Sequence, residues 1–213
     1  MRKGIFNYLL IAVFSVAAAF TSCDKKPDDN GNGNGTGTGN GIKINGILWA
    51  TRNVDKPGTF TASPEIAGMF YQWNRKTGWS STNPIVNSEG GTTWNNTTPS
   101  GTSWTTANSP CPSGWRLPTI SELESLKNSS STWSELNGVD GRFFGSDEEK
   151  LFLPAVGHRD GEGTLGYVGS FGTYWSSAAC GSEDAYYLGF TSAGANTHYY
   201  LRYYGYSIRC VKE

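Results

Sequence analysis

The stretch CPSGWRLPT, which ends at Thr119, constrains the fold more than any other part of the sequence. It brings together a cysteine, a tryptophan, two prolines and the start of a helix. Thr119 and Glu122 have the spacing of a capping box, in which the threonine hydroxyl and the glutamate carboxylate each accept the other residue's backbone N–H. A helix is therefore predicted to begin directly after Thr119. One stripe of this helix, which we expect to pack against a sheet, carries Ile120, Leu123 and Leu126.

The first 41 residues are not expected to form a domain. Residues 1–22 have the charged start and the short apolar stretch of a signal peptide, too short for a stable membrane span. This stretch ends at Thr21-Ser22-Cys23, which resembles the lipobox of bacterial lipoproteins, where the cysteine is acylated. Residues 23–41 are polar and glycine-rich, which predicts a flexible tether. We therefore expect a lipid anchor at Cys23 in a bacterial outer membrane, with display at the cell surface; the alternative is a secreted protein with an unmodified Cys23.

Residues 42–213 are left for a single domain, and roughly 170 residues are enough to bury a core. The net charge of −1, a pI near 6.1 and the lack of a Lys/Arg stripe exclude nucleic acid as an expected partner. The chain contains 8 Trp, 11 Tyr and 28 Gly residues, a mixture typical of extracellular, β-rich modules. This composition favours a recognition role.

Short aromatic or β-branched runs separated by turn residues predict antiparallel strands. Asn45-Gly46 lies between two such runs, 42–44 and 47–49, and predicts a hairpin with a type I′ turn. Further strands are expected at 69–73, 151–153, 174–177, 186–190, 198–201 and 206–211. Turns are expected at Asn137-Gly138, Asp140-Gly141 and Asp160-Gly161, and a long loop at 74–110 with Trp79, Trp94 and Trp104. The predicted class is α+β, a twisted antiparallel sheet with few short helices and long loops.

Acidic residues and histidines form no pattern that indicates a metal or a catalytic centre. Residues 147–149 and 160–162 carry carboxylates suited to calcium, but without EF-hand spacing a solvated acidic loop is the better interpretation. His158 and His198 have no second histidine or cysteine at ligand spacing, and His158 is interpreted as a hydrogen-bonding loop residue. Glycoside hydrolysis needs two carboxylates a few ångströms apart, which sequence spacing does not place. No metal, no cofactor and no enzymatic activity are expected.

Aromatic residues near the C-terminus are the main candidates for ligand contact. The set comprises Tyr186, Tyr187, Tyr199, Tyr200, Tyr203, Tyr204 and Tyr206. A phenol offers an apolar face and a hydroxyl, and in adjacent pairs on a strand one ring should face inward and the other outward. Two alternatives stay open: ladders of rings that only stabilise the sheet, and indoles that only attach the long loop to the core. We expect a ligand at Tyr199, Tyr203 and Trp94, and each Ala substitution should weaken binding without unfolding.

Six motifs spread over the domain point to a known family: GILWATRN at 46–53, YQWNR at 71–75, PCPSGWRLPT at 110–119, LPAVGHR at 153–159, YWSS at 174–177 and GYSIRCV at 205–211. In these motifs the chain resembles the Fibrobacter succinogenes major paralogous (FISUMP) domain, a family of bacterial surface and secreted modules. The resemblance implies a fold related to C-type lectin-like domains and formylglycine-generating enzymes, with both chain ends in one sheet, but no activity. The calcium triplets of C-type lectins and the second C-terminal cysteine of the oxygen-activating enzymes are missing. Neither chemistry is expected.

The cysteines are expected to form one disulfide. A signal peptide directs the domain to an oxidising compartment, and acylation of Cys23 leaves three cysteines, one of which must stay free. Cys111 and Cys210 lie in motifs of the resembled family, whereas Cys180 falls in a Gly/Ser turn outside them. Within 206–211 apolar and polar residues alternate, so Cys210 is expected to face the core. The resemblance thus favours Cys111–Cys210, with Cys180–Cys210 and Cys111–Cys180 as the alternatives.

The sequence as a whole predicts a surface-anchored lipoprotein that displays a non-catalytic binding or adhesion domain for a glycan or a protein. One alternative is a structural subunit of a surface assembly, such as a pilus or an adhesin tip, and another is a glycan-acting enzyme. A monomeric domain that retains a glycan would favour binding over assembly. Two carboxylates that converge in a cleft would favour an enzyme.

Overall fold

A hairpin opens the part of the chain described by the computed structural model, which covers residues 41–146 and 148–213. Strands β1 (Gly41–Ile44) and β2 (Ile47–Ala50) are joined by Asn45 and Gly46 with φ of 51° and 84°, so the predicted turn is confirmed. Gly41, which the prediction assigned to the tether, belongs to β1. The predicted signal peptide, the acylation of Cys23 and the rest of the tether lie outside the described residues.

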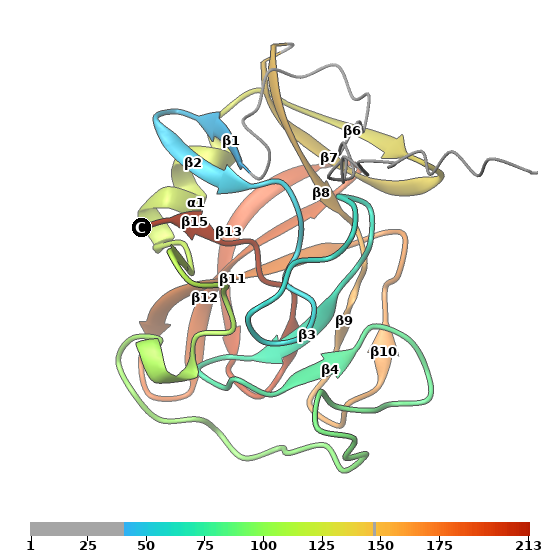
Figure 1. Ribbon diagram of the computed structural model, residues 1–213, viewed down its shortest axis with the longest axis vertical. Helices are drawn as coiled ribbons and strands as arrows, with labels where there is room; N and C mark the ends of the chain where they lie inside the picture. The colour runs from blue at the N-terminus through green and yellow to red at the C-terminus, as the bar shows by residue number, and fades with distance from the viewer. Residues whose placement is uncertain (1–40, 147) are drawn as a thin grey trace, which may run out of the picture. The chain divides into compact units, whose positions relative to one another are not determined.

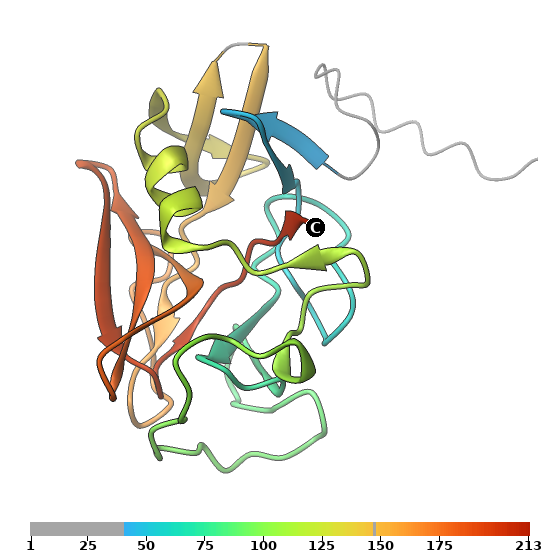
Figure 2. The same cartoon turned by 90° about the vertical axis from the view of Figure 1, so that its left-hand side faces the viewer.

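Both ends of the described chain lie in one four-stranded sheet, in the order β1-β2-β15-β5. Strand β15 (Val211–Lys212) lies between β2 and β5 (Trp115–Arg116), and Val211 pairs with both neighbours. Figure 2 shows the C-terminus beside the hairpin formed by β1 and β2. The end of the chain is thus fixed next to the segment that leads into the helix.

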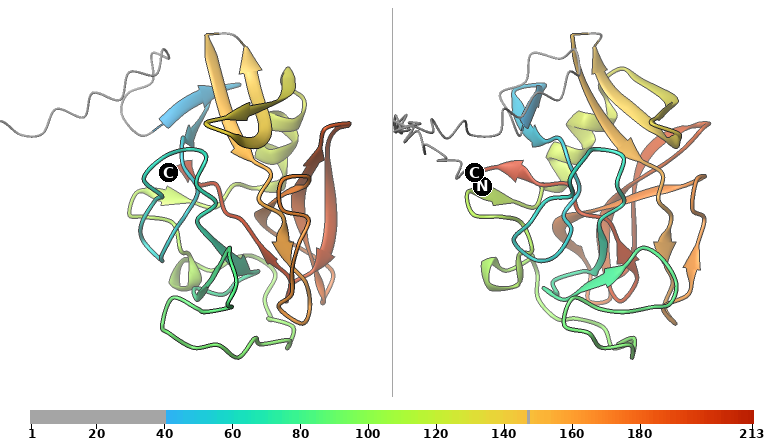
Figure 3. Two further views of the ribbon diagram at one scale, coloured as in Figure 1. Left: turned by 90° about the vertical axis from the view of Figure 1, so that its right-hand side faces the viewer. Right: turned by 45° about the vertical axis from the view of Figure 1, so that its right-hand side comes forward.

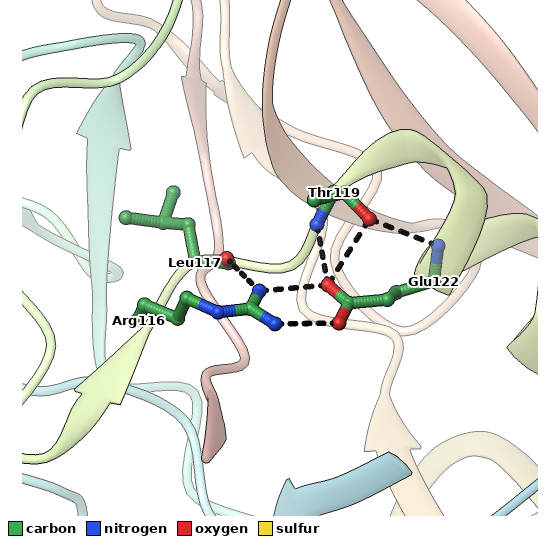
Figure 4. Close-up of polar contacts among 4 residues, drawn as sticks. All are labelled: Arg116, Leu117, Thr119 and Glu122. Carbon is green, nitrogen blue, oxygen red and sulfur yellow. Dashed lines mark hydrogen bonds and ion pairs between the residues drawn. The ribbon is translucent and has the colours of Figure 1, made fainter. Parts of the chain in front are cut away.

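The predicted helix is present as α1 (Ile120–Lys127), and Figure 4 shows how it starts. The Thr119 hydroxyl accepts a hydrogen bond from the Glu122 amide at 3.2 Å, and the Glu122 carboxylate accepts one from the Thr119 amide at 2.7 Å. Arg116 binds the same carboxylate through two nitrogens, at 2.8 and 2.7 Å, and so joins β5 to the helix. Leu123 and Leu126 are buried, whereas Ile120 is only partly buried. Among the described residues, no helix has the length and apolar character needed to cross a membrane.

A three-stranded sheet packs against α1 and separates two parts of the core. Its strands are β11 (Gly172–Cys180), β12 (Asp184–Thr191) and β13 (Gly194–Leu201), with β13 at one edge. Leu188 and Phe190 share one part of the core with Leu123 and Leu126 of α1. Trp175 and Tyr187 belong to the other part. Because alternate residues of a strand face opposite ways, the second face of this sheet is turned away from the helix.

A five-stranded sheet lies across from that second face, in the order β10-β9-β14-β3-β4. Its strands are β10 (Leu165–Gly166), β9 (His158–Arg159), β14 (Gly205–Tyr206), β3 (Met69–Gln72) and β4 (Gly78–Ser80). The predicted strand at 69–73 is confirmed. The segment 74–110 is not wholly a loop, because it contains β4 and the 3-10 helix η1 (Thr106–Asn108). Its irregular part, in green, runs around the lower edge in Figure 1.

The middle of the chain forms a three-stranded sheet, although its sequence predicted mainly turns. Strands β6 (Ser131–Leu136), β7 (Val139–Ser146) and β8 (Glu149–Pro154) pair in sequence order. Asn137 and Gly138 form the predicted turn, with φ of 51° and 78°. The turn predicted at Asp140-Gly141 is wrong, because both residues lie inside β7. Gly141 is needed there because a Cβ would collide with the Leu153 carbonyl of the neighbouring strand.

The C-terminal segment 206–211 is not the single alternating strand that the sequence predicted. It begins in β14 and ends in β15, and every residue from Tyr206 to Val211 is at most 2% exposed. Its backbone bonds to several segments, since Trp175 and Val54 donate to the carbonyls of Ser207 and Ile208. Cys210 is buried as expected, but the polar residues between the apolar ones are buried too. The segment therefore runs through the interior with protein on both sides.

The predicted disulfide between Cys111 and Cys210 is confirmed. Cys180 is free, and it is the last residue of β11 rather than part of a turn. In the part of the chain that the structure describes, the strands are mostly antiparallel and accompany one short α-helix, so the coarse α+β class is confirmed. They are distributed over four small sheets instead of one.

Candidate functional site

A cavity of about 490 Å³ lies between the second face of the β11–β13 sheet and the β9 end of the five-stranded sheet. We call it the aromatic cavity, because six aromatic side chains line it: Tyr167, Phe171, Tyr187, Tyr200, Tyr204 and Tyr206. His158 and Asp160 complete its wall. The segments that supply these residues, orange to red in Figure 3, lie side by side in both views. The volume is within the range of roughly 300–1,000 Å³ typical of small-molecule sites.

The floor of the aromatic cavity is rigid because its rings belong to the core. Tyr206 is 2% exposed, and its ring stacks on Trp175 at a centroid distance of 4.2 Å. Tyr187 is buried against Tyr206 at 4.9 Å. Burial raises the pKa of Tyr206 well above its usual value and that of Tyr204 to about 12, so both phenols keep their protons at neutral pH.

The rim of the aromatic cavity is open to solvent. Tyr200 is 42% exposed, and its ring contacts Tyr204 edge-on at 4.7 Å. Tyr167 is 67% exposed and has a φ of 60°, a backbone conformation that is uncommon for a residue other than glycine. This conformation accompanies the stacking of the Tyr167 ring on His158, at 5.2 Å and an interplanar angle of 21°. The exposed ring of Tyr167 therefore covers a buried histidine.

His158 lies among the rings of the cavity, and its Nδ1 has no hydrogen-bond partner among the described residues. It is 9% exposed, and its ring is 5.5 Å from Tyr206 and 6.0 Å from Tyr204. The sequence interpretation of His158 as a hydrogen-bonding loop residue is wrong, because it belongs to β9 and its Nδ1 is buried without a hydrogen bond among the described residues. Burial lowers its pKa below the ordinary value, against the opposing effect of Asp160. At neutral pH the imidazole is uncharged.

Asp160 supplies the negative charge of the aromatic cavity. Its Oδ1 accepts hydrogen bonds from the amides of Glu162 and Thr164, both at 2.9 Å, and so closes the loop after β9. A neighbouring cavity of about 440 Å³ shares Asp160 and Tyr204 with the aromatic cavity and adds Glu162. Among the residues that the structure describes, no lysine or arginine lines either cavity. The two together form an acidic, aromatic surface.

The three residues predicted to bind a ligand are not brought together. Tyr203 lines the neighbouring cavity. Trp94 is half-buried against Trp79, and it packs so closely under Gly163 and Gly205 that a Cβ on either would lie 2.9 or 2.8 Å from its ring. Trp94 therefore packs beneath the acidic, aromatic surface and supports its backbone.

Tyr199 is 59% exposed, but its ring contacts Tyr186 on the opposite face of the β11–β13 sheet. His158, Tyr167 and Phe171 were not among the residues predicted to contact a ligand. The only sequence signal for one of them was the motif at 153–159, which contains His158.

The aromatic cavity combines ring faces, phenol hydroxyls, one carboxylate and one uncharged imidazole. Such a set can hold a ligand by stacking and by a few directed polar contacts. Within residues 41–146 and 148–213, no group of three or more His, Cys, Asp or Glu side chains is placed to hold a metal ion. The arrangement is suited to recognition.

The model of the Lcl C-terminal domain family matches residues 68–212 of the chain. The match starts one residue before β3, spans more than half of the chain and includes every residue that lines the aromatic cavity. No curated protein and no solved structure matches.

Proposed function

The chain belongs to the Lcl C-terminal domain family, and we propose that it is a surface-anchored lipoprotein whose domain binds an extracellular glycan or protein without catalysis. The observation that carries this proposal is the aromatic cavity, with exposed rings at its rim and a rigid floor. A relationship to FISUMP domains and to the C-type lectin-like fold is part of the proposal and rests on the motifs at 46–53 through 205–211.

The rim explains how binding would gain free energy. Tyr200 and Tyr167 expose ring faces, and covering such a face removes apolar surface from water at about 25 cal/mol per Å². The phenol hydroxyls can bond the polar groups that sugars and peptides carry. The floor rings of Tyr187 and Tyr206 are already ordered by packing, so little side-chain entropy is lost when a ligand settles on them.

The anchor in this proposal is Cys23, which follows a signal peptide and precedes a polar tether. A tether is useful to a domain that must reach a ligand beyond the membrane. Metabolic labelling with a fatty acid tests the anchor: wild type should be labelled and Cys23→Ala should not. Equal labelling of both, or of neither, contradicts it.

Binding is tested on a glycan array with the protein purified in a polyoxyethylene detergent, which carries neither sugar nor ammonium groups. Wild type should retain at least one glycan, and Tyr200→Ala should lose it. Tyr199→Ala is the matched control, because Tyr199 is the neighbouring exposed tyrosine and faces away from the cavity. Retention by Tyr200→Ala together with loss by Tyr199→Ala would place the site elsewhere.

A further inference from the structure

We propose that the aromatic cavity binds an alkylated ammonium group, the cation found in choline headgroups and in methylated lysine side chains. The inference rests on the proposed function, because it specifies the chemical group that the same cavity recognises. It follows from three properties of the cavity: its rings, its charge and its unpartnered histidine.

The rings form a cage of the kind that attracts organic cations. Tyr200 meets Tyr204 edge-on at 4.7 Å, Tyr187 meets Tyr206 at 4.9 Å, and the open space lies between these pairs and Tyr167. The face of an aromatic ring carries negative potential and attracts a cation whose centre lies within about 6 Å of the ring centroid. A trimethylammonium group spreads its charge over methyl groups and is therefore only weakly hydrated. It can contact several ring faces at a small cost in desolvation.

The charge of the cavity has the matching sign. Asp160 is the acidic residue among the described residues that line the cavity, and its Oδ2 accepts no hydrogen bond from the described residues. The adjacent basic residue, Arg159, is 1% exposed, and its guanidinium donates to the carbonyls of Ser80, Thr82 and Gly163 at 2.8, 2.6 and 2.7 Å. Its charge is therefore held away from the cavity and does not oppose a bound cation.

His158 gives an observation independent of the rings and of the charge. It is nine-tenths buried in the cavity wall, and its buried Nδ1 has no hydrogen-bond partner among the described residues. A buried polar group without a partner costs free energy, so a ligand that brings a hydroxyl or an N–H to this wall would recover part of that cost. The hydroxyl of choline and the amide of a lysine residue both carry such a group.

As the part of a glycan or protein ligand that enters the cavity, a neutral sugar ring fits these properties less well than an alkylated ammonium group does. Its hydroxyls call for several directed side-chain partners, whereas the cavity offers phenols, one imidazole and one carboxylate, and no amide or guanidinium. A weakly hydrated cation needs ring faces and a counter-charge, and both are present.

Calorimetric titration of the protein in polyoxyethylene detergent tests the inference. The probes are choline and its neutral isostere 3,3-dimethylbutan-1-ol, which has a carbon in place of the nitrogen. Choline should bind at least about tenfold more tightly than the isostere, because only the cation gains from the ring faces and Asp160. Equal affinity for the two probes, or no heat of binding with choline at millimolar concentration, overturns the inference. This comparison uses wild type and does not depend on a variant's folding.

Variants then locate the site. Tyr200→Ala and Tyr200→Leu should each weaken choline binding roughly tenfold, Tyr200→Phe should retain it, and Tyr199→Ala should leave it unchanged. Asp160→Asn keeps an acceptor for the loop amides and should still weaken binding, because it removes the counter-charge. Unchanged binding in Tyr200→Leu and Asp160→Asn overturns the inference.

Two further arms separate this inference from the function on which it rests. Nα-acetyl-Nε-trimethyllysine methylamide replaces choline as the probe, and a preference for either one identifies the source of the cation while supporting the shared chemistry. A glycan-array signal that needs Tyr200 but is not displaced by choline overturns the cation inference and leaves the proposed function standing. If no ligand is found whose binding depends on Tyr200, both the cation inference and the proposed function are contradicted.

Discussion

Tyr199 and Tyr200 are consecutive residues of β13, and their rings lie on opposite faces of the same sheet. The Tyr199 ring contacts Tyr186 at a centroid distance of 6.2 Å on the face turned toward α1, whereas the Tyr200 ring contacts Tyr204 at 4.7 Å in the aromatic cavity. Both side chains are exposed, at 59% and 42%. The chain thus contains a matched pair of tyrosines that differ chiefly in the face they occupy.

Ala substitution of either tyrosine should destabilise the domain to a similar extent. Each Ala substitution removes an exposed ring with one edge-on aromatic contact, so Tyr199→Ala and Tyr200→Ala should each lower the free energy of unfolding by about 0.5–1.5 kcal/mol. Urea unfolding of both variants checks this. A much larger loss for Tyr200→Ala would mean that Tyr200 supports the core, and the variant could then not report on binding.

Loss of the disulfide should destabilise the whole domain. It joins residues 99 apart, and in the chain-entropy model closing a loop of that length stabilises by roughly 4–5 kcal/mol. The double variant Cys111→Ala, Cys210→Ala should therefore unfold at a much lower denaturant concentration than wild type. Cys180→Ala serves as the control and should change little. Non-reducing peptide mapping that found Cys180 in a linked peptide would contradict the pairing.

The side chain of Asn53 binds the buried guanidinium of Arg209. Its Oδ1 accepts hydrogen bonds from Nε and from a terminal nitrogen of Arg209, at 3.0 and 2.7 Å, and Arg209 is 1% exposed with its pKa lowered by burial to about 10. Removing this acceptor leaves part of a buried guanidinium unpaired. Asn53→Ala should lower the free energy of unfolding by about 3 kcal/mol or more. The exposed Asn96→Ala is the control, and an equal effect of the two would refute this role of Asn53.

His158 should make stability depend on pH. Burial lowers its pKa in the folded protein below the value of about 6.5 expected in the unfolded chain. The unfolded state therefore binds the proton first as pH falls, so the contribution of His158 is complete above about pH 6.5 and is lost as pH falls toward the folded pKa. Melting temperatures between about pH 7.5 and 5 should fall further for wild type than for His158→Phe. Parallel curves would contradict this.

Local signals in the sequence predicted local structure well. Asn45-Gly46 and the pair Thr119 and Glu122 fix their backbone through neighbouring residues, and the hairpin and the helix start were both predicted correctly. Gly141 shows the limit of such signals, because it resembled a turn residue although a close approach to β8 requires it. The need for a glycine there comes from a strand that the local sequence does not contain.

The aromatic cavity could not be predicted because its residues come together only in the tertiary structure. His158, Tyr167, Tyr187 and Tyr200 come from four separate segments, and none has a partner at a fixed sequence spacing. Alternation along β13 predicted that adjacent tyrosines face opposite ways, but it could not show that Tyr200 rather than Tyr199 faces the cavity. That choice depends on which face of the sheet α1 covers.

The position of a bound cation tests the central claim most directly. A crystal structure of the protein with arsenocholine, in which arsenic replaces the nitrogen of choline, would locate the cation by its anomalous scattering. The arsenic should lie within about 6 Å of the ring centroids of Tyr200 and Tyr204, between these rings and Asp160. An ordered arsenic beside Tyr199 or in any place outside the aromatic cavity would contradict the account.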